Sequence, residues 1–151
     1  MKQGDFSELA KAYIHRPAYS SLILNALLKY VSLPSGGGIA DVGAGTGKLT
    51  KELAFTQSPI FAVEPNDAMR QEGIAYTQDF SNISWFKGSG ENTGLSSDSV
   101  HWVTMASSFH WTDSQKSLPE FHRILKEKGF LTLIWNPRNV QASSLHTEIE
   151  G

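Results

Sequence analysis

The chain has 151 residues, 40% of them hydrophobic and 19% charged, which is the length and composition of one globular domain. A formal net charge of −2 gives no overall basic surface for nucleic acid, and the absence of cysteine excludes disulfides and thiolate metal sites. No run of residues is long and apolar enough to span a membrane, and the N-terminus lacks a signal-peptide pattern. We therefore expect one cytoplasmic domain over residues 1–151 that binds neither nucleic acid nor membranes.

Helical and extended patterns alternate along the chain. The first helix is expected between Tyr19 and Val31, where one apolar face consists of Leu22, Ile23, Ala26, Leu27, Tyr30 and Val31. Short apolar runs predict five strands, at residues 39–41, 59–64, 84–87, 100–105 and 130–135. The alternation predicts an α/β fold, a doubly wound and mostly parallel sheet with helices on both faces.

Three more helices are expected between these strands. One covers residues 48–55, and a second begins with Asn66 or Asp67 as its cap. The third covers 114–128, is followed by Gly129, and has a buried face made of Leu118, Phe121, Ile124 and Leu125. The domain would then consist of an N-terminal cap and helix, a core and a tail, over residues 1–35, 36–136 and 137–151.

A glycine-rich turn follows the first strand. It consists of Asp41, Gly43, Ala44, Gly45, Thr46 and Gly47. A dinucleotide-binding fingerprint would need a third glycine where the chain has Lys48. A phosphate-binding Walker A loop would need glycine in place of Val42 and serine or threonine in place of Leu49. The spacing therefore excludes both phosphate-binding motifs and leaves Asp-x-Gly-x-Gly-x-Gly.

This pattern resembles the glycine-rich motif of the class I S-adenosylmethionine (SAM) dependent methyltransferases. In that family the turn lies against the methionine part of SAM, and the acidic residue, here Asp41, helps to hold the amino group directly or through water. The resemblance covers Tyr13 to Asn136. Two alternatives are a glycine-rich turn that binds no ligand and a nucleotide-binding oxidoreductase domain, which rests on fold analogy alone.

Further cofactor contacts are expected after the second and third strands. Glu64 ends the second strand, where an acid can accept hydrogen bonds from both ribose hydroxyls, and Pro65 and Met69 follow it. The alternative for Glu64 is a surface carboxylate. After the third strand, Ser89, Gly90 and Glu91 stand where many relatives have Asp-Ala-Glu. Ser89 can then bond the adenine without the charge of an aspartate, and Glu91 is either a cofactor contact or a helix-start or packing residue.

The segment after the fourth strand resembles a small-molecule subgroup of the family, the type 11 and type 25 enzymes similar to trans-aconitate methyltransferase. That subgroup has Ala-Phe-His-Trp where this chain has Ser108-Phe109-His110-Trp111. Met105, which precedes this segment, is a further expected cofactor contact. His110 is predicted to orient the acceptor or to act as a base, or else to pack the loop onto the sheet. No histidine pair has metal-ligand spacing, so no metal is expected.

The N-terminal segment resembles the same subgroup, which often opens with Tyr-x-x-x-Arg-Pro-x-Tyr folded over the cofactor pocket. Here Tyr13 begins that pattern, and Arg16 is expected to pair with the SAM carboxylate or an acidic substrate. The alternative is a solvated arginine beside a helix.

The resemblance implies methyl transfer to a small-molecule acceptor, or a SAM-binding domain or fragment without turnover. The family's sheet ends in an antiparallel hairpin, for which the residues after Asn136 are too few, so five strands are expected with the hairpin missing. The strand over 130–135 would then present an apolar edge, which predicts either a homo-oligomer through that edge or poor solubility.

Overall fold

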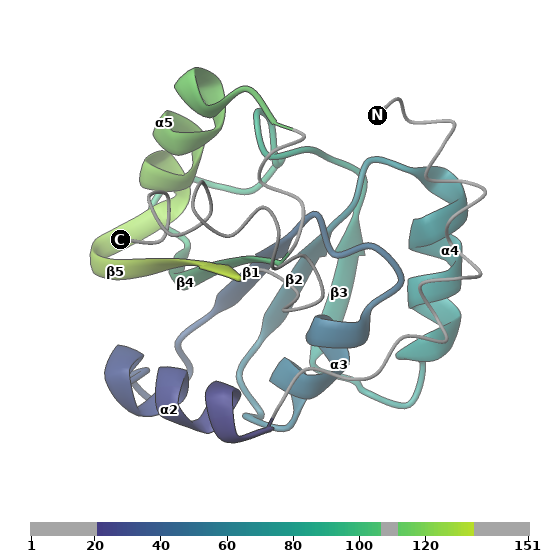
Figure 1. Cartoon of the computed structure of the whole chain (residues 1–151), viewed down its shortest axis with the longest axis horizontal. Helices are drawn as coiled ribbons and strands as arrows, with labels where there is room; N and C mark the ends of the chain where they lie inside the picture. The colour runs from purple at the N-terminus through teal and green to yellow at the C-terminus, as the bar shows by residue number, and fades with distance from the viewer. Residues whose placement is uncertain (1–20, 107–111, 135–151) are drawn as a thin grey trace, which may run out of the picture.

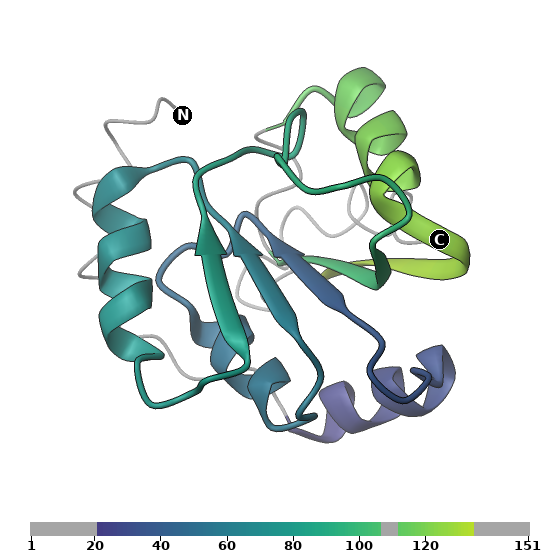
Figure 2. The same ribbon diagram turned by 180° about the vertical axis from the view of Figure 1, so that it is seen from behind.

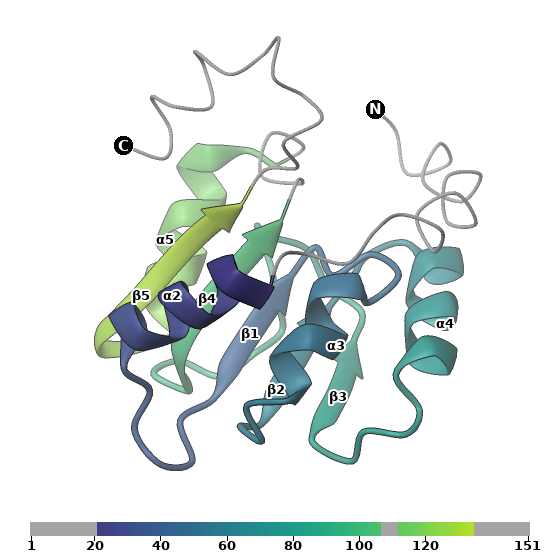
Figure 3. The same cartoon turned by 60° about the horizontal axis from the view of Figure 1, so that its bottom comes forward.

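The computed structural model describes residues 21–106 and 112–134, which form one sheet covered by helices on both faces (Figures 1 and 3). In chain order the elements are α2 (Ser21–Val31), β1 (Ile39–Val42), α3 (Lys48–Ala54), β2 (Ile60–Val63), α4 (Asp67–Tyr76), β3 (Ile83–Phe86), β4 (Val100–Ala106), α5 (Ser114–Ile124) and β5 (Leu125–Ile134). No helix within these described ranges has the length and apolar character needed to cross a membrane.

The five strands are parallel and follow the order β3-β2-β1-β4-β5, which confirms the predicted doubly wound fold. Figure 2 shows β3, β2 and β1 side by side with their arrowheads at the same edge. The strand order reverses between β1 and β4, since β1 pairs with β2 on one side and with β4 on the other. Ligands of open α/β sheets bind at such a switch point, beyond the carboxyl ends of the strands.

Each face of the sheet carries its own apolar cluster. On the face of α5, the buried residues are Ala40, Val42, Val63, Leu95, Val100, Val103, Met105, Phe121 and Ile124. On the face of α2 and α3, they are Leu24, Val31, Ile39, Leu49, Leu53, Ile60 and Trp102. Because β1 is buried on both sides, its sequence is almost continuously apolar, as expected for a central parallel strand.

Helix α4 packs against β3 with Gly73 facing the ring of Trp85. A Cβ atom on Gly73 would come within 2.2 Å of the Trp85 ring, so the indole fills the space beside the helix backbone. Trp85 donates a hydrogen bond from Nε1 to Thr77 Oγ1 (3.0 Å), and that hydroxyl donates to the Gly73 carbonyl (2.8 Å). The helix is thereby fixed beside the glycine turn.

The predicted apolar face of α2 faces the sheet only at Leu27 and Val31. The helix packs on the sheet through Leu24 and Val31, with Leu27 and Leu28 partly buried, whereas Leu22 is 78% exposed. Ile23, Ala26 and Tyr30 are exposed as well. Two apolar stripes overlap in this helix, and the one with spacing i, i+3, i+4 and i+7 faces the sheet.

The end of α5 also differs from the prediction. The helix stops at Ile124, where the carbonyls of Arg123 and Ile124 accept hydrogen bonds from the N–H groups of Asp98 and Ser99 (2.9 and 2.8 Å). These bonds replace further helical turns, and β5 starts at Leu125 instead of after Gly129. The predicted buried face holds for Phe121 and Ile124, whereas Leu118 is 44% exposed and Leu125 is partly buried.

Candidate cofactor site

The glycine turn between β1 and α3 depends on three left-handed residues. Gly43, Gly45 and Gly47 have φ values of 69°, 60° and 89°, which are costly for any residue with a Cβ atom. The N–H groups of Gly43 and Ala44 donate to the Val63 carbonyl (2.8 and 3.0 Å), which pins the turn to the end of β2. The motif therefore specifies the backbone path at the switch point.

The second and third glycines differ in what surrounds them. A Cβ on Gly45 would meet Met69 Cε at 3.4 Å, an ordinary contact. A Cβ on Gly47 would meet Trp85 Cζ2 at 3.2 Å and Thr77 Cγ2 at 3.3 Å. Gly47 is thus required for close packing of α3 against α4 and β3. At Gly45 the lack of a side chain leaves the backbone of the turn accessible to a ligand.

Asp41 is a buried acid held by two hydroxyl groups. It is 1% exposed, and its two carboxylate oxygens accept hydrogen bonds from Thr50 Oγ1 (2.6 Å) and Thr104 Oγ1 (3.0 Å). Thr104 is its register partner on β4, and Thr50 lies on α3. Burial raises the pKa of Asp41 to about 6, although both threonine bonds lower it. A positive charge near this carboxyl would lower its pKa and stabilise its ionised form.

Glu64 joins the glycine turn to the start of α4. Its Oε1 accepts a hydrogen bond from the Gly45 N–H and its Oε2 from the Asn66 N–H, both at 2.8 Å. The residue is 4% exposed, and burial raises the pKa of its carboxyl. A carboxylate has about four lone-pair sites, so both oxygens keep acceptor capacity for hydroxyl donors of a ligand.

Pro65 and Met69 lie beside this carboxylate. Asn66 caps α4 by accepting a hydrogen bond on Oδ1 from the Met69 N–H (2.9 Å), which places Met69 in the first turn. Met69 is 3% exposed and its methyl group approaches Gly45, whereas Pro65 is partly buried. Both residues therefore belong to the same corner of the site as Glu64.

The residues after β3 form a tight turn of their own. The N–H of Ser89 donates to the Asn92 carbonyl (2.9 Å), and the N–H of Asn92 returns to the Ser89 carbonyl (3.2 Å). Gly90 between them is buried, since a Cβ there would lie 2.9 Å from Thr112 Cγ2 and 3.4 Å from Met105 Cε. Gly90 and Met105 are thus neighbours, as expected for parts of one site.

Glu91 makes a contact with the start of α5. Its Oε2 accepts a hydrogen bond from the N–H of Asp113 (3.1 Å), and Asp113 in turn caps the helix by accepting from the Gln115 N–H (3.0 Å). No helix begins at Glu91 in the described structure, so this contact supports the packing alternative for Glu91.

Thr46 carries a polar atom that no described residue satisfies. The side chain is 2% exposed, yet its hydroxyl has no hydrogen-bond partner within the described part of the chain. A buried hydroxyl without a partner is costly, so a ligand or water at the turn would stabilise it. Together with the bare surface at Gly45, this fits a polar ligand lying against the turn.

Three predicted site residues, Tyr13, Arg16 and His110, lie outside the described residues. Within the described ranges, no group of three histidine or acidic residues is arranged to hold a metal ion. Thr50 and Thr104 are the site residues that the sequence analysis missed. No local pattern marks a threonine on α3 or β4 as a partner of Asp41, because the contact depends on the strand register.

Comparisons with known proteins assign the family. The family described as a methyltransferase domain matches residues 40–133. An uncharacterized methyltransferase of Schizosaccharomyces pombe is 32% identical over 134 residues, which is 88% of this chain and 52% of the relative. An uncharacterized methyltransferase of Mycobacterium bovis is 33% identical over 125 residues, 82% of this chain and 48% of the relative. The chain thus spans about half the length of these curated relatives.

A solved structure agrees with this assignment. The putative methyltransferase from an antibiotic biosynthesis pathway of Anabaena variabilis superposes with a TM-score of 0.66 at 35% identity, over 75% of this chain and 44% of that one. The matched region contains the glycine turn, Glu64 and Met105. The chain therefore belongs to the methyltransferase domain family, the class I methyltransferases whose cofactor is S-adenosylmethionine.

Proposed function

We propose that this chain binds SAM beyond the carboxyl ends of β1, β2 and β4 and transfers its methyl group to a small-molecule acceptor. The observation that carries the proposal is the meeting of two buried acids, Asp41 and Glu64, with a left-handed glycine turn at the switch point.

Different residues of the chain would contact different parts of the cofactor. Asp41 would serve the amino group, because two neutral hydroxyls hold its buried carboxyl and no cation among the described residues pairs with it. Glu64 would accept the ribose hydroxyls while it keeps the Gly45 N–H. The segment Ser89–Glu91, beside Met105, would lie along the adenine. Tyr13 and Arg16 are proposed to cover the pocket.

The bound cofactor supplies a methyl group on a positively charged sulfur, which an acceptor nucleophile takes in one in-line displacement. Such a reaction depends mainly on positioning and on exclusion of water. His110 is proposed to orient the acceptor or remove its proton. The net charge of −2 and the resemblance of residues 109–111 to the small-molecule subgroup support a small acceptor.

Calorimetric titration with SAM tests the binding. Glu64→Ala and Asp41→Ala are each expected to weaken binding roughly tenfold or more, because each removes a charged hydrogen-bond acceptor worth about 1.5–3 kcal/mol. Glu64→Gln, which keeps one acceptor oxygen, should bind with intermediate affinity. Asp79→Asn, a change of an exposed acid, is the matched control. Unchanged affinity in both alanine variants would contradict the proposed site.

Turnover separates the enzyme from the second candidate, a SAM-binding domain or fragment without catalysis. Release of S-adenosylhomocysteine is measured with a panel of small carboxylic acids and amines. His110→Ala should lower turnover and leave SAM affinity unchanged. Binding without turnover on any acceptor would favour the second candidate.

We also propose self-association through β5. This strand is at the end of the sheet and pairs with β4, and Phe130, Leu131 and Leu133 are partly buried. Within residues 21–106 and 112–134, β5 pairs on one side only, and a strand edge with apolar side chains tends to find a partner. Sedimentation over a wide concentration range is expected to show an oligomer that Leu131→Lys dissociates, and a monomer at every concentration would contradict it.

A further inference from the structure

We propose that Glu120 and Arg123 of α5 are positioning residues for the adenine side of the cofactor site. They hold the β3–β4 loop, residues 87–99, in the conformation in which Ser89–Glu91 meets the ligand. This inference rests on the proposed function. Glu120 and Arg123 would influence cofactor binding through the loop, without contacting the cofactor themselves.

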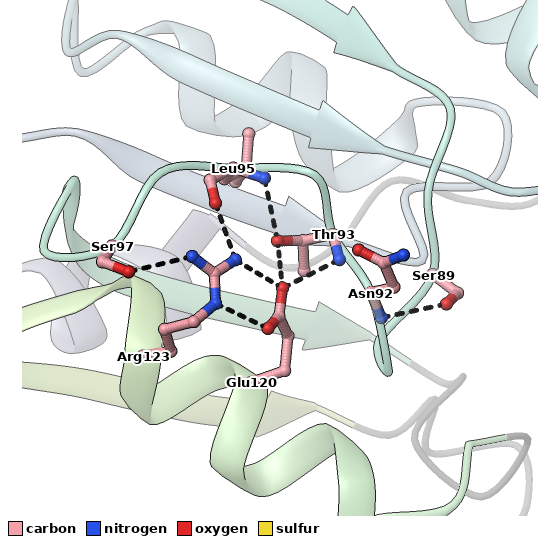
Figure 4. A network of polar contacts seen from close by, with 7 residues as sticks. All are labelled: Ser89, Asn92, Thr93, Leu95, Ser97, Glu120 and Arg123. Atoms are coloured by element: carbon pink, nitrogen blue, oxygen red, sulfur yellow. Dashed lines mark hydrogen bonds and ion pairs between the residues drawn. The ribbon is translucent and has the colours of Figure 1, made fainter.

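The two side chains form the centre of a network that reaches into the loop (Figure 4). Arg123 donates two hydrogen bonds of 2.8 Å to Glu120, from Nε to Oε1 and from Nη2 to Oε2. The same guanidinium donates to Ser97 Oγ (3.0 Å) and to the Leu95 carbonyl (2.6 Å). A planar guanidinium can satisfy a carboxylate and two loop atoms together, which an ammonium cannot do with the same geometry.

Glu120 binds the loop directly through Thr93. Its Oε2 accepts hydrogen bonds from the Thr93 N–H (2.9 Å) and Oγ1 (2.7 Å), and that hydroxyl oxygen accepts from the Leu95 N–H (3.1 Å). Thr93 is 0% exposed, and the Glu120 side chain is 11% exposed. Loss of this carboxylate would leave a buried N–H and hydroxyl without their acceptor.

The carboxylate of Glu120 is charged under ordinary conditions. Its hydrogen bonds from Arg123, together with those from Thr93, lower the pKa of Glu120 to about 2 although partial burial raises it. Bonds to an ionised acceptor are shorter and roughly twice as strong as neutral ones. The contact to Thr93 is therefore a firm attachment of the loop to α5.

The loop is attached to α5 at both ends of the helix. At the C-terminal end, the carbonyls of Arg123 and Ile124 accept hydrogen bonds from Asp98 and Ser99. At the N-terminal end, Glu91 accepts the hydrogen bond from Asp113 described above. Residues 91–99 thus follow the helix from its start to its end, and the helix sets where the loop lies.

This attachment reaches the cofactor site through the turn before Thr93. Ser89 and Asn92 close that turn with backbone hydrogen bonds, and Asn92 directly precedes Thr93. Gly90 packs toward the helix, because a Cβ there would lie 3.5 Å from the ring of Phe121, the neighbour of Glu120. Release of Thr93 would free the Ser89–Asn92 turn, and the adenine side of the pocket would lose its fixed shape.

Paired titrations test this role. S-adenosylhomocysteine and 5′-methylthioadenosine, which lacks the amino-acid part, are titrated into wild type, Glu120→Ala and Glu120→Gln. We expect Glu120→Ala to weaken both ligands by about the same factor, at least tenfold, because the loss lies on their shared adenosine. Glu120→Gln, which keeps one oxygen for Thr93, should lose less. Val31→Ala, a buried change on the opposite face of the sheet, is the control for lowered stability.

The outcomes separate this inference from the proposed function. If wild type binds neither ligand, the proposed function fails. If wild type binds both and folded Glu120→Ala binds them as tightly, the positioning role is overturned. A loss confined to S-adenosylhomocysteine overturns it as well. A loss equal to that of Val31→Ala at matched stability would show a merely structural role and also overturn it.

Discussion

Asp41 and Glu120 are both largely withdrawn from water, yet the protein gives them opposite partners. Two neutral threonine hydroxyls hold Asp41, and burial outweighs their bonds and raises the pKa of its carboxyl to about 6. A guanidinium holds Glu120, and the pKa of its carboxyl falls to about 2. Glu120 is already neutralised by Arg123, and the pair has a structural role. Asp41, at the switch point, has no cationic partner among the described residues, so it can still pair with the cationic group of a ligand.

The largest expected effect is on the pH dependence of stability at Asp41. Because the folded-state pKa lies above the usual 3.8, the group favours folding at low pH and loses that contribution as the pH rises through about 6. Asp41→Asn should remove this loss and raise the free energy of unfolding at pH 8 by about 2–3 kcal/mol relative to wild type. Urea denaturation between pH 4 and 8 measures it, and parallel curves for the two proteins would contradict it.

Glu120 should show the opposite sign and a smaller effect. Its folded-state pKa lies below the usual 4.5, so its contribution is present above pH 4.5 and is lost as the pH falls toward about 2. Glu120→Gln should therefore lose less stability than wild type in that window, by about 1–2 kcal/mol, since Arg123 is partly in water. Acid unfolding followed by circular dichroism measures the difference, and an identical acid limb would disprove the assignment.

The smallest effect is expected at the threonines that hold Asp41. Thr50→Val and Thr104→Val each remove one hydrogen bond that lowers the pKa of Asp41, so each should raise it and cost about 1 kcal/mol of stability at pH 7. Thr50 should matter more, because its bond is the shorter at 2.6 Å. The Asp41 carboxyl is followed by NMR during a pH titration, and an unshifted midpoint in both variants would contradict this account.

The sequence predicted the parts of the site that depend on local backbone chemistry. Three glycines in alternation specify left-handed turns at Gly43, Gly45 and Gly47, and an acid at the end of the next strand specifies Glu64. The first four strand positions followed from short apolar runs, whereas β5 begins at Leu125 and not at the predicted residue 130. The alternation with helices predicted a parallel sheet, which the structure confirms.

Contacts between distant segments were beyond the sequence analysis. The pair Asp41 and Thr104 depends on the register of β1 against β4, and the pair Thr93 and Glu120 depends on how the β3–β4 loop crosses α5. The errors in the predicted apolar face of α2 have a related cause. Leu22 and Leu24 are equally apolar, so composition cannot decide which of two overlapping stripes meets the sheet.

The bonds from Glu64 to Gly45 and Asn66 have a consequence for the thermodynamics of binding. They order the glycine turn and the start of α4 before any ligand arrives, so the entropic cost of that order is part of folding. A ligand then meets a preorganised surface and does not spend its binding energy on arranging the loop. A substitution of Glu64 would leave the glycine turn to be ordered during binding rather than during folding. The chain would then bind its ligand more weakly, even if another group replaced the hydrogen bonds between Glu64 and the ligand.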